Sequence, residues 1–234
     1  MFSQFKFVTG NPNKAKEVGD ILGVSIEQVE VVDLFEIQTQ DLDELVSHKA
    51  QQAYDALVSP IMVEDSGLIF HAWKGLPGAL VKWFETTVGC EGMLKMLHSF
   101  DNRRARAICC FAVHDGKKIQ IVRGEVEGTI SNEIRGVNGF GWDVLFIPEG
   151  YEKTYAEMSS EEKNAISHRK RALEKLKEDK KTAGIPVIML TNLGQKDDVQ
   201  KGLDLGADDY LIKAHFKPSD TVKKVLDVIE KHKK

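Results

Sequence analysis

Two neighbouring carboxylates, Glu64 and Asp65, follow directly on the apolar run at 61–63 and precede a Ser-Gly pair. The run predicts a brief buried strand, and the Ser-Gly pair predicts a turn at its end. Ligands of α/β proteins bind at the carboxyl ends of strands. Glu36 follows a second expected strand and could approach the same edge, giving an oxygen-rich site of the kind that Mg²⁺ accepts. The alternative is that each acid is an exposed turn residue.

The segment TGNPNK, at 9–14, combines turn residues with the expected start of a helix. The N-terminus of a helix exposes free backbone N–H groups and a positive dipole end, which together attract phosphate. Thr9 and Asn11 add neutral donors, and Lys14 adds a cation. The segment is not a Walker loop, because GxxxxGK[ST] is absent. A strand-to-helix turn without a ligand is the commoner explanation of such a segment taken alone.

The segment NGFGWDVLF, at 138–146, places two aromatic residues among glycines and beside a carboxylate. Phe140 and Trp142 could stack on a base, and Asp143 could accept hydrogen bonds from ring N–H groups. The alternative is that both aromatic side chains belong to the core.

The segment EEKNAISHR, at 161–169, is dense in hydrogen-bond donors. If it is one helix, Lys163, Ser167 and Arg171 share a face at i, i+4 and i+8, and His168 and Arg169 lie beside that face. The alternative is a solvated charged helix. No His or Cys spacing in the chain resembles a zinc site.

The elements that must position these residues alternate between short apolar runs and helical periodicity, which predicts an α/β fold. Strands are expected at 5–8, 29–32, 61–63, 105–115, 117–128 and 144–147, and helices at 13–22, 41–57, 81–97 and 160–179. Asp115-Gly116 predicts the hairpin between the two longest strands.

Composition excludes several classes of protein. Hydrophobic residues make up 42% and charged residues 29% of the 234 residues, which is typical of a soluble globular protein. No apolar run approaches the roughly 18 residues of a membrane span, so no membrane is expected as a partner. The three cysteines are too few for a disulfide framework and favour a cytoplasmic location. The net charge of −4 argues against binding a nucleic-acid backbone.

These segments, in this order, resemble the inosine triphosphate pyrophosphatase family. The resemblance rests on TGNPNK, LFEIQTQDLDE, EDSGL, LPGALVKWF, GFGWDVLFIPEGYEKTYAEM and EEKNAISHR, and it covers about residues 5–176. It implies a two-lobed α/β fold with a long mixed sheet and a central cleft, and a homodimer. It also implies the hydrolysis of deaminated purine nucleoside triphosphates (ITP, dITP, XTP) to monophosphate and pyrophosphate with Mg²⁺.

The resemblance assigns roles to the matching positions. Asp65 falls on the proposed general base and, with Glu36, on the metal ligands, while Glu64 supports them. The residues implied to bind substrate are Thr9, Gly10, Asn11, Lys14, Lys49, Ser66, Lys82, Phe140, Gly141, Trp142, Asp143, Lys163, Ser167, His168 and Arg169.

Base choice should depend on the purine 6-position. Hypoxanthine and xanthine present an oxygen acceptor there, whereas adenine presents an amino donor. Donors such as His168 and Arg169 satisfy the first and leave the second unpaired, which costs about 1–3 kcal/mol per group and gives roughly 10-fold to 100-fold discrimination. Guanine also carries the 6-oxo group, so its rejection must come from the 2-amino side, and the sequence does not show how.

The last part of the chain is expected to be separate from a pyrophosphatase domain at 1–179. Residues 180–234 carry 11 Lys against 8 Asp and Glu, whereas the first 179 carry 21 Lys and Arg against 28 acids. The tail resembles the second half of a two-component receiver domain, with Thr191 and Lys213 at the switch and phosphate-contacting positions. The phospho-acceptor strand has no counterpart, and Ala214 replaces the usual proline, so a structural or dimerisation appendage is expected. The alternative function is an inactive nucleotide-binding or signalling protein that uses this tail.

Overall fold

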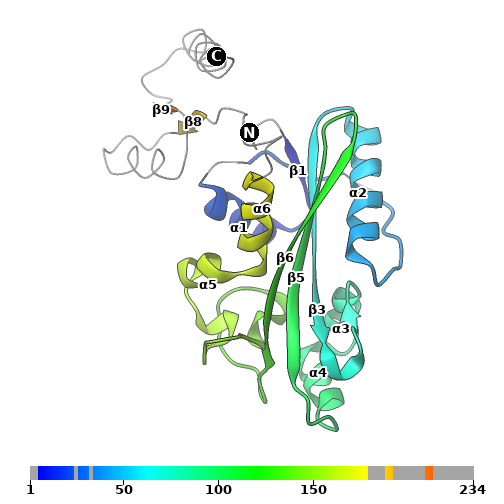
Figure 1. The fold of residues 1–234 in the computed structure, drawn as a ribbon, viewed down its shortest axis with the longest axis vertical. Coiled ribbons are helices and arrows are strands. Elements are labelled where there is room, and N and C mark those ends of the chain that lie inside the picture. The colour runs from blue at the N-terminus through cyan, green and yellow to red at the C-terminus, as the bar shows by residue number, and fades with distance from the viewer. Residues whose placement is uncertain (1–4, 24–25, 32–33, 179–187, 192–208, 213–234) are drawn as a thin grey trace.

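The computed structural model describes residues 5–23, 26–31, 34–178, 188–191 and 209–212. Its centre is a seven-stranded mixed sheet, seen nearly edge-on in Figure 1. The strands are β1 (Lys6–Val8), β2 (Gln28–Val29), β3 (Ile61–Phe70), β4 (Pro77–Gly78), β5 (Arg104–His114), β6 (Ile119–Ile130) and β7 (Phe146–Pro148).

The sheet changes from parallel to antiparallel at β3. The strand order is β2-β1-β3-β5-β6-β7, with β4 paired to β3. β2, β1 and β3 run parallel, whereas β3, β5, β6 and β7 pair antiparallel. The expectation of a long mixed sheet is therefore confirmed. The last parallel pair is Val8 with Val63, so Glu64 and Asp65 come directly after the parallel part ends.

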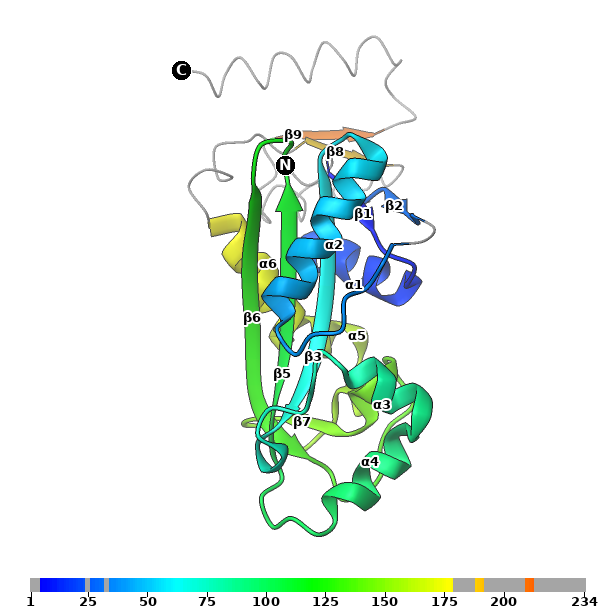
Figure 2. The same ribbon diagram turned by 90° about the vertical axis from the view of Figure 1, so that its right-hand side faces the viewer.

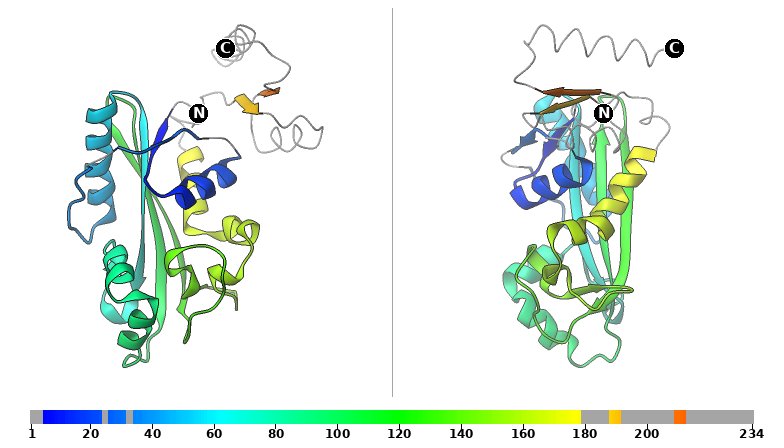
Figure 3. Two further views of the ribbon diagram at one scale, coloured as in Figure 1. Left: turned by 180° about the vertical axis from the view of Figure 1, so that it is seen from behind. Right: turned by 90° about the vertical axis from the view of Figure 1, so that its left-hand side faces the viewer.

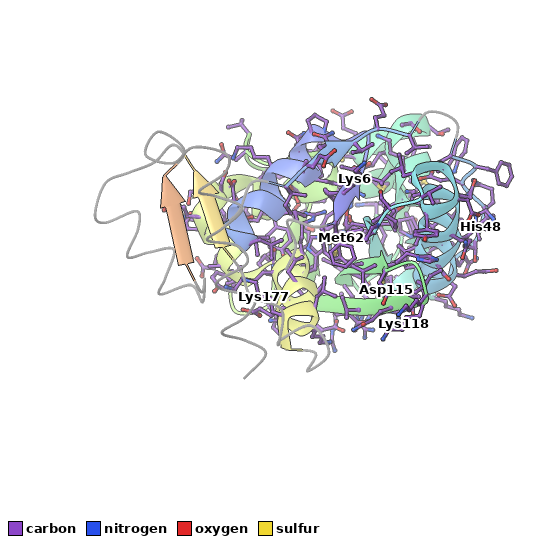
Figure 4. All side chains as sticks on the ribbon, turned by 90° about the horizontal axis from the view of Figure 1, so that it is seen from above. Lys6, His48, Met62, Asp115, Lys118 and Lys177 are labelled. Atoms are coloured by element: carbon purple, nitrogen blue, oxygen red, sulfur yellow. The ribbon has the colours of Figure 1, made fainter. Side chains whose placement is uncertain are left out.

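Helices cover both faces of this sheet. They are α1 (Pro12–Leu22), α2 (Leu42–Leu57), α3 (Val81–Thr87), α4 (Gly89–Leu97), α5 (Ser160–Ile166) and α6 (His168–Glu178). Figure 1 shows α1 and α6 on one face and α2 on the other, and Figure 3 shows the same layers from behind. In Figure 4, His48 on α2 and Lys177 on α6 lie on opposite sides of Met62 in β3. The helices on each face pack against the sheet and form a separate apolar core with it.

A third apolar core lies toward the far ends of the long strands. There α3 and α4 pack with three short 3₁₀ helices, η2 (His71–Trp73), η3 (Gly141–Val144) and η4 (Tyr155–Glu157). Figure 2 shows α3 and α4 below α2 at that end of the sheet. Trp142, Phe146 and Tyr155 belong to this core, and their rings lie 5.1–6.4 Å apart.

Several expected element boundaries differ from the structure. The strand expected at 144–147, for example, begins only at Phe146. Two of the differences change how site residues are positioned. The expected strand at 61–63 does not end in a Ser-Gly turn, because β3 continues to Phe70 and pairs with β5 along its whole length. Leu68 and Phe70 are buried and extend the apolar pattern past the two acids. Gly67 allows β4 to lie close, since a Cβ there would come 2.8 Å from the Gly78 carbonyl oxygen.

The expected single helix at 160–179 is also interrupted. Ser167 has extended backbone angles (φ −68°, ψ 157°) that end α5, and α6 starts at the next residue. At the start of α5, Ser159 and Glu162 form a reciprocal capping box. The helix expected at 81–97 is likewise divided into α3 and α4, and α4 begins at Gly89, whose φ is 70°.

Two short strands follow the main fold in sequence. β8 (Ile188–Thr191) and β9 (Asp209–Ile212) pair in parallel. Most of the segment that resembles a receiver domain lies outside the described residues. In the part of the chain that the structure describes, no helix is long and apolar enough to cross a membrane.

Candidate functional site

The first part of the site is the turn between β1 and α1. Asn11 is the N-cap of α1, and its Oδ1 accepts hydrogen bonds from the backbone N–H groups of Asn13 (3.0 Å) and Lys14 (3.4 Å). Thr9 Oγ1 accepts a hydrogen bond from the Asn11 N–H at 3.1 Å. These short-range bonds shape the turn and project the Lys14 side chain toward β3.

Two carboxylates on β3 meet two lysines from different helices. Lys14 Nζ lies 3.0 Å from Glu64 Oε2 and 3.4 Å from Asp65 Oδ1. Lys49 Nζ, on α2, lies 2.7 Å from Asp65 Oδ2 and 2.5 Å from Glu36 Oε1. The structure therefore brings Glu36 to the same place as the two acids, as the sequence predicts.

The charges of these groups are fixed by one another. Burial works to raise the pKa of Glu64, but Arg169 and Lys14 outweigh it and hold that pKa well below its usual range. Burial also works to raise the pKa of Asp65, and Lys14 and Lys49 lower it. Burial opposes protonation of Lys49, yet Asp65 and Glu36 keep its pKa above the ordinary value. Glu64, Asp65 and Lys49 are therefore charged at neutral pH.

The second part of the site lies between η3 and α5. Lys163 is buried, and its Nζ lies 2.5 Å from Asp143 Oδ2 and 2.6 Å from Glu17 Oε1. The same ammonium lies 4.8 Å from the centre of the Phe140 ring. Asp143 Oδ2 also accepts a hydrogen bond from the Phe140 backbone N–H at 2.8 Å. Burial raises the pKa of Asp143, although Lys163 opposes it.

The break at Ser167 sets the next two residues in place. Ser167 is fully buried, and its Oγ accepts a hydrogen bond from the Lys170 N–H at 3.1 Å, so it caps α6 and does not share a helical face with Lys163. His168 is held between the rings of Trp142 (5.3 Å) and Tyr155 (5.9 Å). Burial holds the pKa of His168 well below its ordinary value, so the ring is neutral.

Arg169 joins the two parts of the site. Its side chain is 1% exposed. It donates to Glu64 Oε1 at 3.0 Å and to Ser66 Oγ at 3.3 Å, and it pairs with Glu17 on α1. Nine alternating charges therefore form one connected series, here called the ion-pair chain. Its members in order are Asp143, Lys163, Glu17, Arg169, Glu64, Lys14, Asp65, Lys49 and Glu36.

Two neighbouring cavities lie along the ion-pair chain. One, of about 660 Å³, is lined by Thr9, Gly10, Glu36, Lys49 and Glu64 among others, and the second, of about 270 Å³, is lined by Ser66, Phe140, Gly141, Trp142, Asp143, Lys163, His168 and Arg169 among others. Asn11, Lys14, Asp65 and Lys82 line both cavities. Every residue expected in the site except Ser167 lines one or both.

Two site residues were not expected from the sequence. Glu17 pairs with both Lys163 and Arg169, and its position three residues after Lys14 on a helix was an available signal. Glu85 lines the second cavity, and its Oε1 is buried without a hydrogen-bond partner. Burial raises the pKa of Glu85. No sequence signal marked Glu85, because a carboxylate on an expected surface helix is ordinary.

The carboxylates of the site surround ammonium groups. Among the residues that the structure describes, no three His, Cys, Asp or Glu side chains are grouped so that they could hold a metal ion. Oxygens of Glu36, in the loop before α2, and of Asp65, on β3, nonetheless converge on one point, and Lys49 Nζ occupies that point.

Known proteins resemble this chain over the same region. The sequence profile of the Ham1 family matches residues 5–179. The inosine triphosphate pyrophosphatase of Scheffersomyces stipitis is 43% identical over 190 residues, which cover 75% of this chain and 97% of that protein. The dITP/XTP pyrophosphatase of Ignicoccus hospitalis is 46% identical over 176 residues, covering 73% and 93%.

Solved structures show the same fold. A HAM1 protein from Coxiella burnetii superposes with a TM-score of 0.65 at 30% identity, over 74% of this chain and 96% of that one. The Ham1 protein of Staphylococcus aureus superposes with a TM-score of 0.62 at 27% identity, over 73% and 95%.

Proposed function

Because this chain belongs to the Ham1 family, we propose that it removes deaminated purine nucleoside triphosphates such as ITP, dITP and XTP from the nucleotide pool. It is a nucleoside triphosphate pyrophosphatase, a hydrolase that acts on acid anhydrides. The observation that carries the proposal is the ion-pair chain, which joins an aromatic cavity to a carboxylate-rich one through residues common to both.

The two cavities suit different ends of one nucleotide. The aromatic side chains of Phe140 and Trp142 give the second cavity a surface on which a purine can stack. Lys14 and Lys82 line both cavities, so they would neutralise a triphosphate that passes from one to the other. Thr9, Gly10 and Asn11 stand at the start of α1, whose dipole adds to that attraction.

The proposed cofactor is Mg²⁺. The donor set fits it, because Glu36 and Asp65 supply hard carboxylate oxygens that converge on one point, with Glu64 beside them. A divalent ion bound by these residues supplies charge neutralisation for the leaving pyrophosphate.

Asp65 is the residue proposed to position water. Its carboxylate is ionised and only 18% exposed, so it can accept a proton from a water molecule held next to the α-phosphate. The products are the nucleoside monophosphate and pyrophosphate. Lys14 and Lys49 border this carboxylate and would receive charge that develops on the phosphates.

The base is selected by donors near the second cavity. The neutral ring of His168 and the guanidinium of Arg169 would face a 6-oxo acceptor in this cavity. An adenine amino group would leave such donors unpaired, which costs about 1–3 kcal/mol for each buried group. A homodimer and a cytoplasmic location belong to the same proposal, and the family resemblance is their support.

The test is a panel of nucleotides. Pyrophosphate release is measured from ITP, dITP, XTP, GTP and ATP, with and without Mg²⁺, and the nucleotide product is identified. We expect monophosphate and pyrophosphate from the first three, with Mg²⁺ required, and roughly 10-fold to 100-fold lower kcat/KM for ATP. Release of inorganic phosphate and a diphosphate, or turnover of none of the five, would contradict the proposal. The second result would favour an inactive nucleotide-binding protein.

A further inference from the structure

The lysines proposed to hold phosphate are already paired with the carboxylates proposed to hold metal. Lys49 bridges Glu36 and Asp65, at 2.5 and 2.7 Å. Lys14 bridges Asp65 and Glu64, at 3.4 and 3.0 Å. In the free protein, the lysines and the carboxylates therefore neutralise each other's charge.

This arrangement penalises either ligand that arrives alone. A triphosphate that draws the two lysines away leaves Asp65, whose side chain is 18% exposed, without a cationic partner and next to new negative charge. The fully buried Glu64 then keeps only its pair with Arg169. A divalent ion that takes the carboxylates leaves two ammonium groups without partners beside a new positive charge. Either arrival alone gives new partners to one set of charges and leaves the opposite set without them.

Arrival of both ligands removes the penalty. The ammonium groups transfer to phosphate oxygens, and the carboxylates transfer to the metal, so every charge regains an opposite partner. We propose that Lys14 and Lys49 exchange partners when substrate binds, so that metal and triphosphate bind with positive coupling and the site takes the metal–triphosphate complex. This inference rests on the proposed function.

The exchange makes a specific prediction for metal binding when Lys49 is removed. Lys49 occupies the point on which Glu36 and Asp65 converge, and its own side chain is 16% exposed. If it competes with the metal for those oxygens, its removal must strengthen metal binding by the nucleotide-free protein. A lysine that only binds phosphate would have no such effect, because the free protein contains no phosphate.

The experiment measures binding instead of turnover. Mg²⁺ is titrated calorimetrically into the full chain, alone and with a saturating α,β-methylene analogue of ITP, which cannot be cleaved between those phosphates. In the wild type we expect the analogue to lower the Kd for Mg²⁺ by roughly tenfold or more, and Mg²⁺ to lower the Kd for the analogue by the same factor. In Lys49→Met we expect the Kd for Mg²⁺ without nucleotide to fall by about fivefold and the coupling factor to shrink.

Controls separate this exchange from general effects of charge. Lys16→Met removes an exposed lysine of the same helix as Lys14, where it pairs with Asp20 at 2.9 Å, and it should change neither Kd. Lys49→Arg keeps the charge and should keep the coupling. Thermal unfolding gives a second readout, since Mg²⁺ alone should raise the Tm of Lys49→Met more than that of the wild type.

Two results would overturn the inference. One is a coupling factor below about twofold in the wild type. The other is unchanged or weaker Mg²⁺ binding by Lys49→Met, when that variant has a wild-type unfolding profile. If either result is found and pyrophosphate is still released normally from ITP, the partner exchange is rejected and the proposed function stands. If the protein neither binds the analogue nor turns over ITP, the proposed function itself is rejected.

Discussion

At the scale of single residues, the site is a set of buried charges that depend on one another. Arg169 is almost fully buried and touches Glu17, Glu64 and Ser66, which come from two separate elements. A buried charge of this kind is stable only while its partners are present, because removal of one partner leaves the others without compensation. Functional residues therefore also carry much of the local stability.

Substitution of Arg169 tests this dependence. Arg169→Met should lower the free energy of unfolding by about 3–5 kcal/mol, because it leaves the buried Glu64 and Glu17 short of a cation. The measurement is urea unfolding followed by circular dichroism. Lys16→Met is the control, since its exposed pair with Asp20 should contribute only about 0.3–0.5 kcal/mol. Equal losses in the two variants would show that burial of Arg169 has no special cost.

His168 gives the protein a dependence on pH. Its folded pKa is lowered by burial, so between that pKa and the unfolded value near 6.5 the unfolded chain binds the extra proton. Stability contributed by this group is complete above about pH 6.5 and falls as pH drops, by about 1.4 kcal/mol per pH unit. His168→Gln should reduce the loss of stability between about pH 7.5 and pH 5 by about 2 kcal/mol. The same slope in both proteins would mean that the histidine is protonated in the fold.

At the scale of elements, the position of the site residues depends on where strands and helices begin and end. α6 starts at His168 because Ser167 interrupts the helix, and α6 then packs against β6 at Gly124. A Cβ at Gly124 would overlap the His168 carbonyl oxygen and the Ala172 nitrogen. Contact between the backbones of β6 and α6 therefore fixes where the first turn of α6 lies along β6, and with it the positions of His168 and Arg169.

A methyl group at that contact should separate the two elements. Gly124→Ala is expected to lower the free energy of unfolding by about 1–3 kcal/mol through overpacking and to lower kcat/KM for ITP as α6 shifts. Thr129→Ala, at an exposed position of the same strand, is the matched control and should stay within about 0.5 kcal/mol of the wild type. Chemical denaturation and the pyrophosphate assay check both variants. A stable, fully active Gly124→Ala would show that the contact can relax without cost.

For most elements in the described residues, the sequence predicted whether they are helices or strands. It predicted the residues at which they end less well. The start of α1 directly after the TGNPNK turn is a local feature and was readable from the chain. The continuation of β3 to Phe70 depends on its pairing with β5, which is distant in sequence, so the local Ser-Gly pair was misleading. The break at Ser167 was not predicted, because the helical spacing of the charged residues continues across it and the extended backbone angles of Ser167 appear only in the structure.

The same distinction applies to the site. Residues within recognisable segments, such as Asp65 and Lys163, were found from the sequence, and the structure places them at the cavities. The pairing between segments was not found, because Lys163 meets Glu17 across 146 positions of the chain. Glu85 was missed because only burial distinguishes it from an ordinary surface acid.

At the scale of the whole molecule, the family match ends at residue 179 and the chain continues to 234. The first 179 residues carry the net negative charge and all of the ion-pair chain, whereas the last 55 carry an excess of lysine. We propose that the boundary at 179 separates the enzyme from an appendage that stabilises or dimerises it.

Deletion of residues 180–234 tests that division. The shortened chain should release pyrophosphate from ITP with a kcat within about twofold of the full chain, because the site lies wholly before the deletion. Its oligomer size, measured by light scattering, or its Tm should fall. Unchanged oligomer size together with unchanged Tm would reject the appendage hypothesis.

The central claim is that Asp65, set between two lysines at the junction of two cavities, performs hydrolysis of a 6-oxopurine triphosphate. The most direct measurement is the rate of pyrophosphate release from ITP, with Mg²⁺, by the wild type and by Asp65→Asn. We expect kcat to fall by about 10²-fold to 10⁴-fold in the variant, because the amide cannot accept the proton of the attacking water. Full activity in a correctly folded Asp65→Asn would contradict the account.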